Sequence, residues 1–301
     1  MANSFKSGFV AIVGRPNVGK STLLNSLMGE KLAIITNKPQ TTRNIVRGII
    51  TTDAAQVIFV DTPGMHRPKD KLSENMVKMA ENSVRDGDVI LFMAAPAEKF
   101  DIHPGDVDIL ARLAQVKSTK FLVINKIDTI DKGRILPITE AYNRACPFDE
   151  TFPISALKGE NLLLLRTHIM KNLPEGPKYF PDGMMTDAPD AFIVGEMIRE
   201  KALYMLQEEI PHGLNVEITG LKKRADKEII DIEATIYCEK KSHKGIIIGK
   251  QGAMLKEIGT RARRDIQRLY DDKINLQLWV KIKENWRDSD YFMRNFGFKT
   301  D

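Results

Sequence analysis

The segment Gly14–Ser21 carries residues whose types and spacing suit chemistry on a phosphate. It reads GRPNVGKS and fits the pattern G-x-x-x-x-G-K-[ST]. In this pattern the glycines let backbone N–H groups converge on phosphate oxygens, the lysine reaches the β- and γ-phosphates, and the serine hydroxyl holds Mg²⁺. We therefore expect Lys20 and Ser21 to bind the phosphates and the metal of a nucleoside triphosphate.

Three further short motifs indicate which nucleotide is bound. Asp61–Gly64 (DTPG) offers a carboxylate that can bind Mg²⁺ through water and a glycine N–H that can sense the γ-phosphate. Asn125–Asp128 (NKID) ends in a carboxylate that can accept both the ring N–H and the exocyclic amine of guanine, a donor pair that adenine lacks. Ser155–Lys158 (SALK) can close a base pocket by backbone contact. Together these motifs predict GTP or GDP with Mg²⁺.

Short apolar runs recur along the first part of the chain, with helical periodicity between them. The runs are continuous rather than alternating, which is typical of parallel strands buried on both faces. They cover residues 9–13, 57–60, 89–93 and 121–124. This alternation predicts a doubly wound, mostly parallel α/β sheet with the motifs at the carboxyl ends of its strands. Residues 45–51 and 56–60 are expected to add one antiparallel edge pair.

Residues 173–183 interrupt this pattern with three prolines and two glycines, which cannot continue a helix or a central strand. We therefore expect a GTP-binding domain over residues 1–173, a linker over 174–189 and a second, α+β domain over 190–301. The expected order in the second domain is helix, two strands, a glycine-punctuated helical region and a strand. A C-terminal helix is expected to pack on this domain through Trp286, Met293 and Phe296.

The second domain contains a G-x-x-G motif at Gly249–Gly252, directly after three isoleucines. It lies within residues 240–268, which hold nine basic and two acidic residues, a balance suited to a polyanion. Paired glycines allow close approach of a nucleic-acid backbone, and isoleucines offer an apolar floor to bases. The expected contacts are Lys244, Ile247, Ile248, Gly249, Lys250, Gln251, Gly252, Lys256 and Arg263. The alternatives are core packing of the isoleucines and a solvated basic helix face.

The four nucleotide motifs resemble the G1, G3, G4 and G5 boxes of translation-factor-type GTPases, and the second domain resembles a type II KH domain. The whole chain resembles the Era/TrmE-like GTPase family with a C-terminal KH domain. This resemblance implies GTP hydrolysis, and binding of single-stranded RNA near the 3′ end of 16S rRNA in the small ribosomal subunit, whose maturation such proteins assist. The implied nucleotide contacts are Gly14, Asn17, Val18, Gly19, Lys20, Ser21, Thr22, Asp61, Gly64, Asn125, Lys126, Asp128, Ser155, Ala156 and Leu157.

The resemblance also bears on hydrolysis, for which Lys20, Thr42 and Gly64 are the expected catalytic residues. Thr42 is assigned as the G2 threonine that joins Ser21 and Asp61 on Mg²⁺, with Thr41 as its competitor.

Many small GTPases place a glutamine directly after the G3 glycine to orient water, whereas this chain has Met65 there. It resembles instead a subgroup in which a phosphate-loop asparagine, here Asn17, helps bind K⁺. We expect slow intrinsic turnover that K⁺ or a partner stimulates. Arg43 and His66 are alternative assisting groups.

Two widely separated cysteines suit a reducing compartment, and an N-terminus without a long apolar run makes the cytoplasm the expected location. We expect a monomer, and the resemblance implies at most weak electrostatic contact to the inner face of a membrane. A metabolic kinase or GTP-driven ligase is a second hypothesis, but the five histidines form no evident acid/base cluster. A plain RNA-binding module with a vestigial nucleotide fold is a third, against which the intact Lys20, Asp61 and Asp128 argue.

Overall fold

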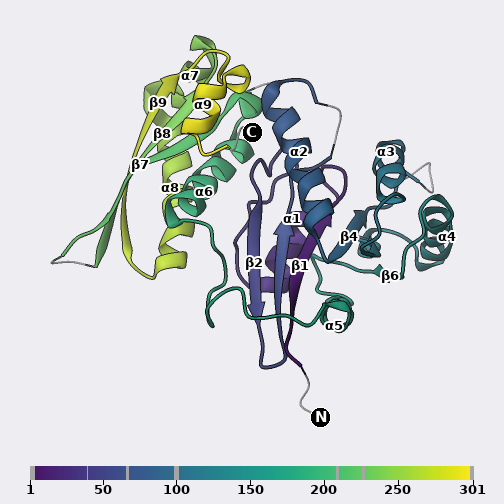
Figure 1. The fold of residues 1–301 in the computed structure, drawn as a ribbon. Helices are drawn as coiled ribbons and strands as arrows, with labels where there is room; N and C mark the ends of the chain where they lie inside the picture. Colours follow the sequence, from purple (N-terminus) through teal and green to yellow (C-terminus); the bar gives the residue numbers. More distant parts are fainter. Residues whose placement is uncertain are drawn as a thin grey trace. The chain divides into compact units, whose positions relative to one another are not determined.

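The computed structural model describes residues 4–38, 40–65, 68–97, 102–207, 210–225 and 228–298. The chain divides into two compact units (Figure 1). The first unit comprises Met1–Ala33, Thr42–Lys69 and Ser73–Asp187, and the second comprises Ile34–Thr41, Asp70–Leu72 and Ala188–Asp301.

The first unit is built on a six-stranded sheet with the order β2-β3-β1-β4-β5-β6. Neighbouring strands are parallel except for β2 and β3, which form an antiparallel pair at one edge. The strands are β1 (Lys6–Val13), β2 (Val46–Thr51), β3 (Ala55–Asp61), β4 (Val89–Ala94), β5 (Thr119–Ile124) and β6 (Glu150–Pro153). The predicted doubly wound sheet, with its antiparallel edge pair, is therefore confirmed.

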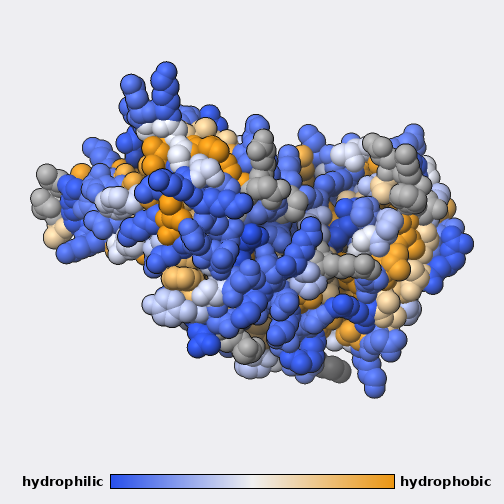
Figure 2. All heavy atoms as spheres, turned by 90° about the horizontal axis from the view of Figure 1, so that it is seen from above, coloured by the Kyte–Doolittle hydropathy of each residue, from blue (hydrophilic) through white to orange (hydrophobic). Residues whose placement is uncertain are grey.

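Helices cover the sheet of the first unit, and the central strands are accordingly buried on both faces. Every residue of β3 and of β4 is buried, as a strand covered on both sides requires. The helices are α1 (Lys20–Met28), α2 (Lys71–Asp86), α3 (Pro104–Leu113), α4 (Ile135–Ala145) and α5 (Leu162–Asn172), with short 3₁₀ turns at Ile127–Thr129 and Lys132–Arg134. On the face seen in Figure 2, hydrophilic side chains predominate and hydrophobic ones form separate patches.

The Pro/Gly-rich segment 174–187 packs along the first unit. The side chain of Gln56, in β3, has no exposed surface. Its amide oxygen accepts hydrogen bonds from the backbone N–H groups of Tyr179 (2.7 Å) and Phe180 (3.0 Å), and its amide nitrogen donates to the Phe180 carbonyl (2.8 Å). One buried glutamine thus satisfies three backbone groups of a segment that has no regular secondary structure.

The second unit contains a three-stranded sheet with the order β7-β8-β9. The β7–β8 pair is antiparallel and the β8–β9 pair is parallel. Its elements are α6 (Asp190–Met205), β7 (Asn215–Lys223), β8 (Ile229–Cys238), α7 (Lys241–Ile248), α8 (Ala253–Tyr270), β9 (Lys273–Ile282) and α9 (Asp290–Asn295), with 3₁₀ turns at Ile210–Gly213, Lys250–Gly252 and Trp286–Asp288. This is the predicted α+β order. The core of the second unit includes alternate residues of β8 and the helix residues that pack against them.

The C-terminal tail packs on the second unit, as its aromatic spacing predicts. Trp286 and Met293 have no exposed surface. The Trp286 indole donates a hydrogen bond to the carbonyl of Gly213 (3.0 Å), and the ring of Phe296 lies 4.8 Å from that of Tyr237. A buried tryptophan with its N–H satisfied contributes a large apolar area without a polar penalty.

Residues 34–41 belong to the second unit through contacts with α6. The backbone N–H of Ile35 donates to the Glu200 carboxylate (3.0 Å). The guanidinium of Arg199, only 1% exposed, donates to the carbonyl of Thr41. Helix α6 therefore holds the backbone that directly precedes Thr42.

Candidate functional site

The loop between β1 and α1 has three residues in backbone conformations that glycine and asparagine adopt more readily than other residues. Gly14, Asn17 and Gly19 have φ values of 150°, 64° and 103°. A Cβ added to Gly14 would lie 2.4 Å from the Met93 carbonyl oxygen, and one added to Gly19 would lie 2.3 Å from the Asn125 amide nitrogen. Close packing from outside thus shapes the loop that the phosphate motif predicts.

Two buried charges face the loop. Lys20 is 7% exposed, and its ammonium donates to the carbonyls of Gly14 (3.0 Å) and Arg15 (3.1 Å). Asp61, at the end of β3, has no exposed surface. Burial lowers the pKa of Lys20 to about 8 and raises that of Asp61 to about 6, and the attraction between the two charges opposes both changes.

Oxygen ligands suited to Mg²⁺ meet beside this pair. The Ser21 hydroxyl lies 2.9 Å from the Thr42 hydroxyl and donates to one Asp61 oxygen at 2.7 Å. The other Asp61 oxygen is buried without a hydrogen-bond partner among the described residues. Hard oxygen donors with a free carboxylate lone pair fit Mg²⁺. No group of three or more His, Cys, Asp or Glu able to hold a metal occurs in the described part.

Thr42, and not Thr41, is the threonine beside Ser21. The hydroxyl of Thr41 instead lies 2.6 Å from that of Thr36 and donates to the carbonyl of Lys38 (2.7 Å). This geometry separates two neighbouring threonines that spacing alone leaves equivalent.

The base-recognition motifs are tied to the phosphate loop. The Asn125 amide, 2% exposed, donates to the Val18 carbonyl (2.8 Å) and accepts from the Ala156 N–H (2.9 Å). The Lys126 ammonium donates to the Asn17 carbonyl (2.7 Å). One asparagine thus joins the phosphate loop to the SALK loop that the sequence expects to close the base pocket.

Of the remaining residues expected to bind the nucleotide, Asp128 and Leu157 are exposed, Thr22 is partly buried and Ser155 is buried. Asp128 is exposed just past the end of β5, and Leu157 is 75% exposed. Ser155 is fully buried, and its hydroxyl accepts from the Lys158 N–H (3.1 Å), which shapes the SALK turn. Thr22, in the first turn of α1, is partly buried.

Gly64 and Met65 follow β3 and approach the phosphate loop. A Cβ on Gly64 would lie 2.8 Å from the Pro16 side chain, so this approach requires glycine. The Met65 N–H donates to the Gly14 carbonyl (3.2 Å). Arg43, one candidate assisting group, is 2% exposed and does not stand in solvent. The other candidate, His66, lies outside the described residues.

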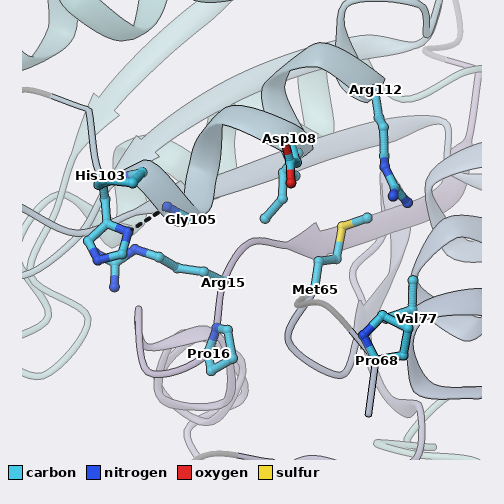
Figure 3. Close-up of a pocket in the computed structure, with 11 residues that line it drawn as sticks. Arg15, Pro16, Met65, Pro68, Val77, His103, Gly105, Asp108 and Arg112 are labelled. Atoms are coloured by element: carbon cyan, nitrogen blue, oxygen red, sulfur yellow. Dashed lines mark hydrogen bonds between the residues drawn. The ribbon is translucent and has the colours of Figure 1, made fainter. Parts of the chain in front are cut away.

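A hollow of about 480 Å³ opens on the outer side of the phosphate loop (Figure 3). Arg15, Pro16, Met65, His103 and Ile109 are among its lining residues. The guanidinium of Arg15 extends from the loop toward His103 (Figure 3). Arg15 occupies a variable position of the phosphate motif, so the pattern gives no reason to single it out.

The G-x-x-G motif forms the turn between α7 and α8. Gly249, Gln251 and Gly252 have φ values of 73°, 52° and 80°. A Cβ on Gly249 would lie 2.7 Å from that of Met254, whereas one on Gly252 would meet nothing within 4 Å. Gly252 therefore leaves open space at the turn, as close approach of a ligand backbone requires.

A groove of about 440 Å³ continues from this turn between α8 and β9. Its lining residues are Gly252, Leu255, Lys256, Gly259, Thr260, Arg263, Leu276 and Leu278. Aliphatic side chains form its floor, and Lys256 and Arg263 contribute positive charge. A base can lie on such a floor while its phosphates meet the cations. Three expected RNA contacts, Gly252, Lys256 and Arg263, are thus brought together.

One expected contact requires correction. Ile247 has no exposed surface and belongs to the core of the second unit, so its side chain cannot form an apolar floor for bases. Its neighbour Ile248 is partly buried and packs against the same core. Lys250 and Gln251 are exposed at the turn, and Lys244 is partly exposed on α7.

Comparison with known proteins matches both parts of the chain. A family model described as 50S ribosome-binding GTPase matches residues 9–126, and one described as KH domain matches residues 209–287. The chain is 51% identical over 299 residues to the GTPase Era of Ruminiclostridium cellulolyticum, with 99% of each chain covered. It is 54% identical over 295 residues to the GTPase Era of Clostridioides difficile, with 98% of this chain and 99% of the relative covered.

Two solved structures are also similar over nearly the full length. One is Era in complex with MgGDPNP and nucleotides 1506–1542 of 16S ribosomal RNA, with a TM-score of 0.93 and 41% identity. The other is a variant of Aquifex aeolicus Era bound to GDP and AlF₄⁻, with the same TM-score and identity. Each match covers 98% of this chain and 100% of the other.

Proposed function

The chain belongs to the family of the GTPase Era, and from this we propose that it is a GTP-hydrolysing switch that binds single-stranded RNA near the 3′ end of 16S rRNA and assists assembly of the small ribosomal subunit. The observation that carries the proposal is that one chain contains two sites. One is the cluster of Lys20, Ser21, Thr42 and Asp61, and the other is the groove beside the G-x-x-G turn.

The residues of the first unit divide the work on GTP. Lys20 would hold the β- and γ-phosphates, and Gly64 would offer its N–H to the γ-phosphate. Ser21, Thr42 and Asp61 would hold Mg²⁺, which neutralises phosphate charge when bound. The unpartnered, buried Asp61 oxygen supports this assignment because it leaves a carboxylate lone pair free for the metal.

Guanine selection is assigned to Asp128, and the loop Ser155–Leu157 closes over the base. Asn125 supports that loop through the Ala156 N–H and the phosphate loop through the Val18 carbonyl. GTP and GDP share these contacts, so the γ-phosphate alone distinguishes the two states. Thr42 and Gly64 are the residues that would respond to the presence of the γ-phosphate.

One peptide bond connects the metal-binding threonine to the second unit. Thr42 lies beside Ser21, and the carbonyl of Thr41 accepts a hydrogen bond from Arg199 of α6. Thr42 would bind Mg²⁺ when GTP is present, and a change in the position of its backbone would pass through Thr41 to Arg199 of α6 and so alter RNA binding. Hydrolysis of the γ-phosphate resets the switch.

RNA binding is assigned to the turn and groove of the second unit. The relative solved with nucleotides 1506–1542 of 16S rRNA supports the choice of that RNA. Lys244, Lys250, Gln251 and Ile248 join the groove residues as contacts at or beside the turn, whereas Ile247 is left out. The groove suits unpaired bases, because an aliphatic floor holds a base only when it is free of its complement.

Hydrolysis by this chain is slow and K⁺-stimulated in our proposal. Met65 carries no group that can orient water, and Asn17 is exposed on the phosphate loop. An Asn17 side-chain oxygen would help hold K⁺ beside the phosphates, where the ion supplies positive charge. Replacing K⁺ with Na⁺ tests this directly, and equal turnover in the two salts would exclude it.

The functional division is a GTP-binding domain over residues 1–173, a linker over 174–189 and a KH domain over 190–301. The protein acts as a monomer in the cytoplasm, where the small ribosomal subunit is its partner, with at most weak contact to the membrane surface. None of the helices in the described ranges has the length and apolarity needed to cross a bilayer.

Crosslinking of the full chain to cellular RNA, with GDPNP or with GDP, tests the proposal. We expect crosslinks concentrated at the 3′ end of 16S rRNA, with a yield that differs between the two nucleotides. Crosslinks spread over unrelated RNAs, or yields independent of the nucleotide, would contradict it.

A further inference from the structure

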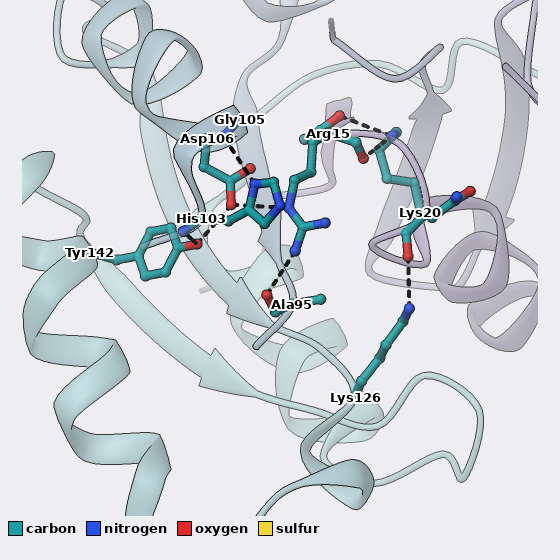
Figure 4. A network of polar contacts seen from close by, with 10 residues as sticks. Arg15, Lys20, Ala95, His103, Gly105, Asp106, Lys126 and Tyr142 are labelled. Atoms are coloured by element: carbon teal, nitrogen blue, oxygen red, sulfur yellow. Dashed lines mark hydrogen bonds and ion pairs between the residues drawn. The ribbon is translucent and has the colours of Figure 1, made fainter. Parts of the chain in front are cut away.

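A buried carboxylate outside every nucleotide motif lies beside the phosphate loop. Asp106, in the first turn of α3, has no exposed surface. One of its oxygens accepts a hydrogen bond from the Tyr142 hydroxyl (2.7 Å) and lies 3.3 Å from Nε of Arg15 (Figure 4). Its other oxygen has no hydrogen-bond partner among the described residues. This carboxylate is therefore buried with fewer hydrogen bonds than it can accept.

A contribution to the stability of the folded protein does not explain why the Asp106 carboxylate is buried. Removing a charge from water costs several kcal/mol, and a single ion pair often does not offset that cost. Burial accordingly raises the pKa of Asp106, while the hydrogen bond from Tyr142 and the charge of Arg15 oppose the rise. What the Asp106–Arg15 pair provides is a fixed position for the guanidinium.

The Arg15 side chain is held at two points. Its Nε meets Asp106, and a terminal nitrogen donates to the carbonyl of Ala95, just past the end of β4 (2.9 Å). These two contacts come from different elements and fix the plane of the guanidinium. The side chain is 17% exposed, so water competes weakly for it.

The backbone of Arg15 bears directly on the catalytic lysine. The Arg15 carbonyl accepts a hydrogen bond from the Lys20 ammonium (3.1 Å), and so does the adjacent Gly14 carbonyl (3.0 Å). Gly14 also accepts from the Met65 N–H (3.2 Å). The residue that Asp106 holds by its side chain thus contributes to the placement of Lys20 by its backbone (Figure 4).

We propose that Asp106 and Tyr142 are positioning residues for the phosphate loop. They hold the Arg15 guanidinium, and Arg15 keeps the first half of the loop and the Lys20 ammonium in the shape that accepts a triphosphate. An ammonium has only three N–H donors, and Lys20 uses two of them on the carbonyls of Gly14 and Arg15. When Lys20 turns to the phosphates, it gives up these carbonyl contacts. The Arg15 anchor then keeps the loop in place. This inference rests on the proposed GTP binding.

Asp106→Asn tests the proposal, because asparagine keeps the shape and loses the charge. Dissociation constants for GTP and GDP should each rise about tenfold, since the Arg15 guanidinium then meets a neutral amide oxygen and not a carboxylate. The kcat at saturating GTP should change by less than about threefold, as expected for loss of binding common to ground and transition states. Tyr142→Phe, which removes one hydrogen bond from Asp106, should produce a smaller change in the same direction.

A double variant separates positioning from general destabilisation. If Asp106 acts through Arg15, Asp106→Asn should weaken GTP binding no further, within about twofold, in an Arg15→Met background. Additive losses in the double variant would overturn the proposal, as would GTP affinity unchanged in both Asp106→Asn and Tyr142→Phe. Asp108→Asn, an exposed acid on the same helix, is the matched control and should bind GTP like the unchanged chain.

The same titrations distinguish failure of this inference from failure of the proposed function. An unchanged chain that binds no GTP would remove the proposed function itself. An unchanged chain that binds GTP, with folded variants that bind it equally well, would remove only the role of Asp106. Thermal unfolding of each variant establishes that it is folded, and Tyr142→Phe remains a test if Asp106→Asn does not fold.

Discussion

The hydroxyl of Thr42 lies 2.9 Å from that of Ser21. The two residues are 21 positions apart in the sequence. The Ser21 hydroxyl also donates to the buried carboxylate of Asp61 (2.7 Å). Thr41, one residue earlier, turns its hydroxyl to Thr36. This difference makes the two threonines experimentally separable.

Thr42→Ala should lower GTP turnover about a hundredfold, which is typical for loss of one group that stabilises transition-state charge. The expected cause is the loss of a Mg²⁺ ligand, so raising the Mg²⁺ concentration should recover part of the activity. Thr41→Ala, the matched control, should keep turnover near that of the unchanged chain. Phosphate release measured across a Mg²⁺ titration decides the matter, and the opposite ranking would refute the assignment.

The kcat/KM for GTP should follow a bell-shaped pH profile, with the acidic limb falling near pH 6 and the basic limb near pH 8. Burial raises the Asp61 pKa to about 6, so falling pH protonates this carboxylate and removes a metal ligand. Burial lowers the Lys20 pKa to about 8, so rising pH discharges the ammonium that faces the phosphates. This profile reports groups of the free enzyme. A flat profile between pH 5 and 9 would contradict the two assignments.

Asp128→Asn should move base preference from GTP toward xanthosine triphosphate. The carboxylate accepts two donors of guanine, and an amide in its place meets one of them with a donor of its own. Competition binding with both nucleotides measures the change. Asp131→Asn, a nearby exposed residue, is the control. Retained preference for GTP in Asp128→Asn would show that another group reads the base.

Much of the nucleotide site follows from local sequence signals. The phosphate loop, the DTPG segment and the NKID segment each follow a continuous apolar run, and parallel strands place such segments at one sheet edge. Asp106 escapes sequence analysis because it is 91 residues from Arg15 and in no motif. Ile247 is the opposite case, a residue that sequence analysis wrongly assigns to the RNA-binding surface. Its sequence neighbours do not reveal that its side chain points into the core.

The Pro/Gly-rich segment 174–187 illustrates a third limit of sequence analysis. Prolines and glycines over 173–183 exclude regular structure, which is correct, but composition does not reveal a docking partner. That partner is Gln56, an amide in a strand whose other residues are apolar except for Asp61 at its end. A buried polar residue in such a strand predicts only that some backbone group must meet it.

Gln56→Leu should destabilise the first unit by about 2–4 kcal/mol, because it leaves backbone groups of Tyr179 and Phe180 without partners. Urea unfolding of the full chain measures the change. Gln115→Leu replaces an exposed glutamine and should leave the midpoint almost unchanged. Equal midpoints for Gln56→Leu and the unchanged chain would show that the segment contributes little to stability.

Gly252→Asp should abolish RNA binding and leave GTP binding intact. Its side chain enters open space at the turn, where the φ of 80° adds backbone strain but no clash, and its charge repels phosphate. Gly249→Asp should also lower stability, because its Cβ would meet Met254 at 2.7 Å. Gly297→Asp is matched in φ (79°) and in open space and should bind RNA normally.

Loss of GTP binding together with RNA binding in Gly252→Asp would point to misfolding of the variant. The dependence of RNA affinity on salt concentration provides a second measurement. Affinity for RNA should fall with a negative slope of log K against log salt, and Lys256→Ala or Arg263→Ala should each reduce the slope by about one.

The central claim is that Lys20 and its loop hold a triphosphate whose base Asp128 reads as guanine. Equilibrium titration of the purified chain with GTP, GDP and ATP in Mg²⁺ tests it most directly. We predict micromolar binding of both guanine nucleotides, no detectable binding of ATP, and release of phosphate from GTP. A folded sample that binds no guanine nucleotide at millimolar concentration would contradict the account.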